Sequence, residues 1–164
     1  MIFVTVGTQL PFDRLVQAVD GWAAMRPAVP VLAQVNGGVY VPRHLQAVPG
    51  LTPAQFTLHF AAAQVVVAHA GMGTIISSLE VGKPLVLLPR LAARGEHRND
   101  HQVGTARRFA GFSCIRVAAF EQDVGPLIDE LLTTGGDLGQ AQGAPDVSAA
   151  LLDGIRRFLA GQPV

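Results

Sequence analysis

Short apolar runs rich in β-branched residues alternate with segments of helical periodicity along most of this chain. The runs lack the alternating polar positions of a half-exposed sheet, which indicates strands buried on both faces. Strands are expected at residues 2–6, 29–35, 64–69, 84–89 and 114–117. Helices are expected at residues 13–25, 53–63, 74–81, 100–110 and 124–132. Strands that alternate with helices predict an α/β fold, with an open parallel sheet and helices on both of its faces.

The length of the chain fits one such domain rather than two. It has 164 residues, of which 49% are hydrophobic, enough for one ordinary core. We expect the α/β domain to span residues 1–132. Small and polar residues dominate at 133–146, which predicts a flexible linker, and 147–164 is expected to hold a C-terminal docking helix.

The charge balance and the cysteine content limit which binding partners and which cellular compartment are expected. Twelve Lys and Arg balance twelve Asp and Glu, so no nucleic-acid partner is expected. The single cysteine, Cys114, lies in an apolar segment and cannot form an internal disulfide, which indicates a buried thiol in a reducing compartment. The first residues begin a strand rather than a signal peptide, so a cytoplasmic location is expected.

The turn after the expected strand at 64–69 carries two glycines and a threonine, in the order VVVAHAGMGT. In open parallel sheets, ligands bind beyond the carboxyl ends of the strands. Gly71 and Gly73 let a ligand approach the backbone, and the next helix directs free N–H groups toward it. The turn therefore predicts a phosphate site, with His69 and Thr74 as further donors. The alternative is a tight turn that needs glycine for its geometry alone, with His69 in the core.

Two well-known phosphate loops do not match this turn. Lys83, the only lysine of the chain, lies too far beyond the glycines for a GxxxxGK[ST] loop. A dinucleotide fingerprint needs a third glycine near Ile76 and an acidic residue about 20 positions later, and neither is present. The phosphate site is therefore of another kind.

Three segments in this order resemble the nucleotide-binding C-terminal half of GT-B glycosyltransferases of the family 28 type. They are FVTVGTQLPFDRLV, VVVAHAGMGTIISSLEVGKPLVLLP and GEHRNDHQ. The segments look most like the small catalytic subunits of two-subunit bacterial exopolysaccharide transferases. The resemblance covers residues 1–132 and implies a single Rossmann-like sheet.

The resemblance also implies roles for individual residues. Gly7 and Thr8 match a loop that approaches the donor diphosphate. The strand-helix turn that binds the phosphates matches His69, Ala70, Gly71, Met72, Gly73 and Thr74. Ser77, at a position that contacts the ribose in relatives, completes the expected phosphate- and nucleotide-binding set. The donor-sugar set comprises the matching pair His101 and Gln102 with their neighbours Glu96, His97 and Asp100. The alternative for this second set is a solvated helix N-terminus, where an acidic residue complements the helix dipole.

One position departs from the family pattern. Many relatives hold the ribose hydroxyls with a glutamate eight residues after the histidine, and this chain has Ser77 there. Glu80 lies one helical turn further, about 4.5 Å along the axis. No catalytic residue is assigned, because in this fold class the general base usually comes from the other half.

The resemblance implies transfer of a sugar, hexosyl or glucuronosyl, from a UDP-sugar to a lipid-linked acceptor in exopolysaccharide or cell-surface glycan assembly. No cofactor and no metal are expected, because helix N–H groups would stabilise the leaving diphosphate. One alternative is a nucleotide-sugar-binding module without turnover, which shares all of these residues. A flavodoxin-like nucleotide protein is another alternative.

A partner subunit is expected because one α/β domain forms only one wall of a GT-B cleft. This partner would bind the acceptor, be tethered to the membrane, and hold the chain peripherally at the inner membrane. The helix at 53–63 carries no charge and the segment 147–159 places apolar residues on one stripe, so both are predicted docking segments. The alternatives are that both helices cover this domain's own core, or that the chain forms a homodimer.

Overall fold

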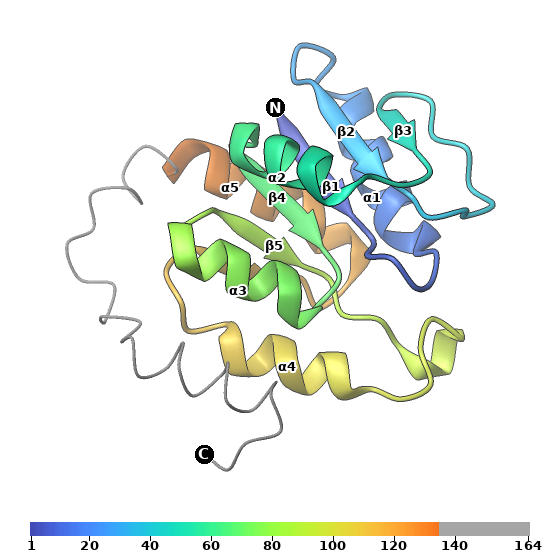
Figure 1. Cartoon of the computed structure of the whole chain (residues 1–164), viewed down its shortest axis with the longest axis vertical. Helices are drawn as coiled ribbons and strands as arrows, with labels where there is room; N and C mark the ends of the chain where they lie inside the picture. Colours follow the sequence, from blue (N-terminus) through green and yellow to red (C-terminus); the bar gives the residue numbers. More distant parts are fainter. Residues whose placement is uncertain (135–164) are drawn as a thin grey trace.

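Six parallel strands form one sheet in the order β3-β2-β1-β4-β5-β6 (Figure 1). The computed structural model describes residues 1–134. Its strands are β1 (Ile2–Thr5), β2 (Val31–Gln34), β3 (Gln46–Val48), β4 (Val65–Ala68), β5 (Leu85–Leu87) and β6 (Ile115–Val117). Its α-helices are α1 (Asp13–Ala24), α2 (Pro53–Ala62), α3 (Met72–Val81), α4 (His101–Phe109) and α5 (Val124–Thr134). Two short 3-10 helices, η1 (Ala92–Arg94) and η2 (Glu121–Asp123), lie in the loops.

The α/β fold with helices on both faces of a parallel sheet is confirmed. In Figure 1, α2, α3 and α4 lie in front of the sheet, and α1 and α5 lie behind it. Each face has its own apolar core, because successive strand residues point to opposite sides. Val4 packs in the core under α1 and α5, whereas Phe3 and Val66 pack in the core under α2, α3 and α4. Cys114 is buried in the second core, as predicted, and burial raises the pKa of its thiol.

Three details differ from the sequence-based expectation. Strand β3 is not among the expected strands, because it is an exposed edge strand of three residues without an apolar run. Helix α3 begins at Met72 rather than at residue 74, so Gly73 lies inside its first turn. Helix α5 continues to Thr134, two residues into the predicted linker. The rest of that linker and the predicted docking helix at 147–164 lie outside the described residues.

The strand order fixes where loops gather. From β1 the chain proceeds outward through β2 to β3, and from β4 it proceeds outward through β5 to β6. The order therefore reverses between the adjacent strands β1 and β4, whose following loops diverge and leave a crevice at their carboxyl ends.

Helix α2 shows how local sequence sets the edge of this crevice. Thr52 caps it through its side chain, Gln55 completes a capping box, and Pro53 occupies the first turn, as predicted. At its other end, the Lys83 ammonium donates to the carbonyls of Ala61 and Ala63 at 2.9 and 2.8 Å. Within residues 1–134, no helix is long and apolar enough to cross a membrane.

Candidate functional site

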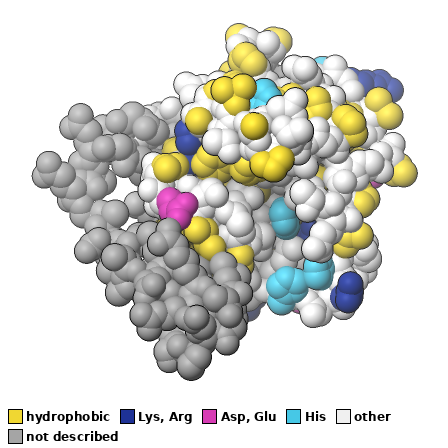
Figure 2. All heavy atoms as spheres, in the orientation of Figure 1, with side chains coloured by type: hydrophobic (Ala, Val, Ile, Leu, Met, Phe, Trp, Pro, Cys, Tyr) yellow, Lys and Arg dark blue, Asp and Glu magenta, His cyan; other side chains and the backbone are white. Residues whose placement is uncertain are grey.

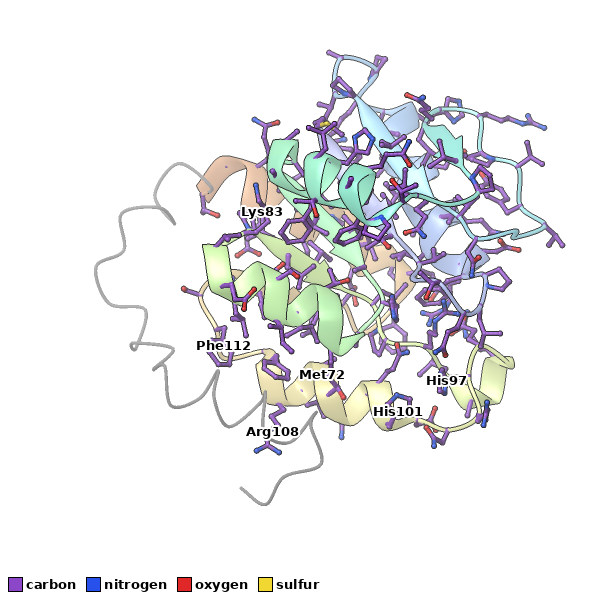
Figure 3. All side chains as sticks on the ribbon, viewed as in Figure 1. Met72, Lys83, His97, His101, Arg108 and Phe112 are labelled. Carbon is purple, nitrogen blue, oxygen red and sulfur yellow. The ribbon has the colours of Figure 1, made fainter. Side chains whose placement is uncertain are left out.

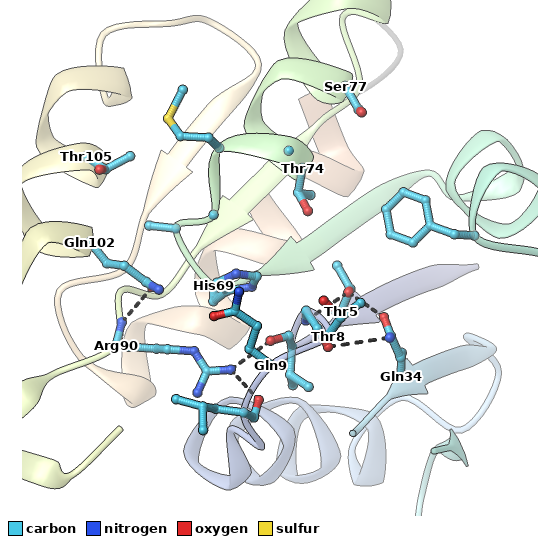
Figure 4. A pocket seen from close by; sticks show the side chains of 18 of the residues that line it. Thr5, Thr8, Gln9, Gln34, His69, Thr74, Ser77, Arg90, Gln102 and Thr105 are labelled. Carbon is cyan, nitrogen blue, oxygen red and sulfur yellow. Dashed lines mark hydrogen bonds between the residues drawn. The ribbon is translucent and has the colours of Figure 1, made fainter. Parts of the chain in front are cut away.

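A cavity of about 770 Å³ lies beyond the carboxyl ends of β1 and β4 (Figure 4). Its walls are the loop after β1 and the N-terminal parts of α2, α3 and α4. The lining includes all the residues predicted to bind the phosphates or the nucleotide: Gly7, Thr8, His69, Ala70, Gly71, Met72, Gly73, Thr74 and Ser77. It also includes three of the five residues predicted to bind the donor sugar: His97, His101 and Gln102. The structure thus brings two sequence-distant sets into one pocket.

The N-terminus of α3 points unpaired backbone donors at this cavity. Gly71 is its N-cap residue and has no side chain to accept from the first turn. The N–H groups of Met72, Gly73 and Thr74 therefore lack the capping partner that Thr52 gives α2. Free N–H groups and the positive end of a ten-residue helix are the features that favour anions at helix N-termini.

The imidazole of His69 is wedged between two glycines of different loops. A Cβ on Gly7 would lie 2.6 Å from His69 Cε1, and a Cβ on Gly71 would lie 2.4 Å from His69 Nε2. Gly7 also has a φ of 81°, which side-chain-bearing residues rarely adopt. At Gly73, in contrast, a Cβ would have no atom within 4 Å. Gly7 and Gly71 are therefore needed to hold His69, whereas Gly73 leaves open space in the pocket.

His69 is held neutral at physiological pH. Burial lowers its pKa from 6.5 to about 4, and the nearby positive charge of Arg90 and the ring of His97 act in the same direction. The backbone of Thr5 acts in the opposite direction and is outweighed. The buried Nδ1 atom has no hydrogen-bond partner among the described residues. The neutral ring carries one N–H donor and one acceptor nitrogen.

The two acidic residues of the predicted sugar-binding set do not line the pocket. The Glu96 carboxylate accepts two hydrogen bonds from the Arg14 guanidinium, in a bidentate pair at 2.7 and 2.8 Å. It also accepts from the Leu91 N–H at 2.9 Å. Asp100 accepts from the Ala92 N–H at 2.7 Å. Through these hydrogen bonds both carboxylates hold the loop between β5 and α4, and their contact with the donor sugar stays a prediction.

The remaining members of the set sit at the start of α4. The rings of His97 and His101 lie edge to face, with centroids 4.5 Å apart, side by side in Figure 3. His101 Nδ1 contacts the side-chain oxygen of Asn99. Gln102 is buried, and its carbonyl oxygen accepts from the Arg90 N–H at 3.2 Å. Gln102 thus faces the pocket and also ties α4 to the end of β5.

Several lining residues were not predicted from the sequence. Thr5 and Gln34, at the ends of β1 and β2, hydrogen-bond to each other at 2.8 Å on the pocket floor. Phe56 of α2 lines the opposite side, and Arg90 lies buried beside His69. The sequence signal for Thr5 and Gln34 is that each is a polar residue at the end of an otherwise apolar strand. Ser77 lines the pocket, whereas Glu80 is exposed and does not.

The side chains that line the pocket include basic residues and no acidic ones among the described residues. No Asp or Glu is among its lining residues in the described part of the chain, whereas Arg90 and three histidines are. Figure 2 shows several histidine side chains at the lower right of this face and others near its top. Over residues 1–134 no group of three or more His, Cys, Asp or Glu is arranged to hold a metal ion. The arrangement suits an anionic ligand with several hydrogen-bonding groups.

A parallel sheet with helices on both faces and a crevice at its strand-order reversal defines a Rossmann-like α/β domain. The model of the glycosyltransferase family 28 C-terminal domain matches residues 1–132, and the chain belongs to this family. No curated protein sequence matches the chain.

Solved structures with this fold include relatives of low identity. MurG of Acinetobacter baumannii has a TM-score of 0.58 and 18% identity, over 94% of this chain and 49% of its own. The solution structure of ALG13 has a TM-score of 0.57 and 18% identity, over 94% of this chain and 96% of its own. VinC, solved in complex with DTDP, has a TM-score of 0.53 and 14% identity, over 98% of this chain and 42% of its own. The chain thus spans less than half the length of MurG and VinC, and the likeness concerns the fold.

Proposed function

We propose that this chain binds the UDP-sugar donor of a glycosyltransferase and provides the donor half of its active site. The observation that carries the proposal is the uncapped N-terminus of α3, which faces the pocket beside Arg90 and His69, where no Asp or Glu of residues 1–134 lines the wall. A nucleoside diphosphate has the matching chemistry, because its phosphates accept hydrogen bonds and carry negative charge. The family supports this assignment, as does the DTDP bound to VinC.

The same groups suit the chemical step of sugar transfer. Negative charge grows on the diphosphate as the bond to the sugar breaks, and preorganised N–H donors stabilise it. The N–H groups of Met72, Gly73 and Thr74 and the charge of Arg90 would act together there. We expect no metal requirement, because the described lining residues include no carboxylate to hold a hard cation. His101 and Gln102 would contact the sugar at the other end of the pocket.

The acceptor side is proposed to come from a second protein. We propose a membrane-tethered subunit that binds a lipid-linked acceptor and holds this chain at the cytoplasmic side of the inner membrane, in exopolysaccharide or cell-surface glycan assembly. Hexosyl or glucuronosyl transfer would then occur only in the assembled pair. The exposed, uncharged surface of α2 beside the pocket supports such docking, since Leu58 is 65% exposed there.

Donor binding can be tested by thermal unfolding of the full chain with UDP. At 100 times its Kd, a ligand that binds only the folded state adds about 2.7 kcal/mol to the free energy of unfolding. For a chain of this size the melting temperature should rise by roughly 5–10 °C. A wild-type chain that UDP does not stabilise would rule out the proposed function.

Gly73→Glu locates the site within the pocket. The new side chain enters open space and places a negative charge in the first turn of α3, so the fold should be kept. The same charge should repel the diphosphate and abolish the UDP-induced shift. Gly21→Glu is the matched control, because Gly21 also lies in a helix with no atom near its Cβ position and is remote from the pocket. A full UDP shift in Gly73→Glu would place the nucleotide elsewhere.

Turnover is tested separately from binding. Labelled sugar from a UDP-sugar should reach a lipid-linked acceptor only when this chain is combined with its acceptor-binding partner. Transfer by the chain alone would contradict the half-enzyme proposal. UDP binding without transfer in any combination would favour the nucleotide-sugar-binding module that does not turn over.

A further inference from the structure

The side chain of Arg90, at the end of β5, is buried although it carries a full charge. Only 2% of its surface is exposed. One guanidinium nitrogen donates to the carbonyls of Val6 and Leu10 at 2.7 and 2.6 Å. Another donates to the carbonyls of Pro11 at 2.6 Å and Glu96 at 3.3 Å. Its planar face lies 4.6 Å from the centroid of the Phe12 ring.

These acceptors belong to the two loops that flank the pocket. Val6, Leu10 and Pro11 enclose the segment that holds Gly7 and Thr8, after β1. Glu96 lies in the loop after β5 that carries His97. One side chain therefore fastens segments that are more than 80 residues apart in sequence, as the dashed lines in Figure 4 show in part.

The charge of Arg90 has no direct carboxylate partner among the described residues. Only backbone carbonyls accept from its guanidinium, and the carboxylate of Glu96 is engaged by Arg14. Burial lowers the pKa of Arg90, and the charge of Glu96 partly offsets this effect. A buried cation without a bonded anion is costly unless a ligand supplies one. The open cavity beside Arg90 is where such an anion would bind.

We propose that Arg90 is a positioning residue for the donor, which fastens the loop after β1 to the loop after β5 and supplies fixed positive charge at the pocket floor. This inference rests on the proposed function. The fastened loops hold Gly7, with Thr8 next to it in the chain, against His69 before the ligand arrives. The fixed charge of Arg90 favours the diphosphate over the uncharged nucleoside.

Two substitutions separate these parts. Arg90→Lys keeps a charge but loses the planar fork, so it cannot reach all four carbonyls. We expect it to weaken UDP and uridine equally, by about tenfold or more. Arg90→Met also removes the charge, and it should weaken UDP further without a further loss for uridine. Arg116→Lys is the matched control, because Arg116 also donates to two carbonyls but does not line the pocket.

A readout without ligand keeps the inference independent of UDP. Arg90 and His97 are the positive or titratable groups that face His69, so Arg90→Met should raise the pH midpoint of the His69 ring signals in NMR. Arg90→Lys should leave that midpoint near the wild-type value but shift the amide signals of Gly7 and Thr8. A merely structural arginine would lower the melting temperature without moving the His69 titration.

The outcomes decide between the two proposals. Wild-type chain that UDP does not stabilise refutes the proposed function, while unchanged Gly7 and Thr8 signals in Arg90→Lys overturn the positioning role by themselves. If Arg90→Met does not fold, Arg90→Lys decides alone: wild-type UDP affinity in that variant overturns the inference. Equal losses in Arg116→Lys would also overturn it, because the effect would then not belong to the pocket.

Discussion

Replacing Gly71 by Ala should force the ring of His69 out of its place. The new Cβ would lie 2.4 Å from Nε2, 2.9 Å from Cε1 and 3.1 Å from Cδ2 of His69, all closer than an ordinary contact. The backbone itself allows Ala, since Gly71 has a φ of −91°. The ring cannot retreat freely, because Gly7 closes its other side. The perturbation is therefore steric and specific to one neighbour.

The size of the effect follows from overpacking. Forcing a methyl group into a filled site costs about 1–3 kcal/mol. Gly73→Ala meets no atom and gains about 0.5–1 kcal/mol from helix propensity. The two variants should therefore differ in melting temperature by roughly 3–16 °C, with Gly71→Ala the lower.

A double-mutant cycle isolates the contact with His69. Ala is a poorer N-cap residue than Gly, which adds several tenths of a kcal/mol to Gly71→Ala whether or not His69 is present. This contribution cancels when Gly71→Ala is measured in wild type and in His69→Ala by urea unfolding. We expect a coupling energy of at least about 1 kcal/mol. A coupling near zero, or equal melting temperatures for Gly71→Ala and Gly73→Ala, would refute the wedged arrangement.

Two further predictions concern His69 and Glu96. Because the pKa of His69 is lowered from 6.5 to about 4, the unfolded chain binds a proton in this window that the folded chain does not. The free energy of unfolding should fall by up to about 3 kcal/mol as the pH drops through the window, and His69→Gln should lose less in urea titrations at about pH 7 and pH 4.5. Glu96→Gln should lower the free energy of unfolding by about 1–3 kcal/mol and speed amide hydrogen exchange at residues 91–100, because the Arg14 fork loses its carboxylate. Lost sugar binding with unchanged stability and exchange would instead mean that Glu96 faces the donor.

The fold could be predicted because its signals are local and repeated. Each central strand is a fully buried apolar run. The start of α2 is marked by Thr52, whose side chain caps the helix, and by Pro53 in the first turn. The short edge strand β3 could not be predicted, since its residues are largely exposed and its pairing with β2 depends on tertiary position. The start of α3 was predicted two residues late, because Gly73 is a poor helix former and the N-cap residue Gly71 has no capping side chain to mark the start.

The pocket was only partly predictable. The glycines of the turn after β4 indicate that a ligand can approach the backbone closely, and this turn lines the pocket. The directions of side chains in the loop between β5 and α4 do not follow from sequence spacing, because Glu96 and Asp100 turn toward distant or loop-internal donors. The partners of Arg90 are more than 70 residues away in three of four cases, so no local pattern reveals them.

Because the His69 ring lies between Gly7 and Gly71, substitutions at these three positions depend on one another during evolution. With histidine at the middle position, a side chain on either glycine loop overlaps the ring, so neither glycine can change first. A smaller residue at position 69 would remove the overlap at Gly71, and only then could Ala become acceptable there. Gly7 would still be constrained by its φ of 81°. Homologous chains should therefore vary at position 71 together with position 69, while position 7 stays glycine in both groups.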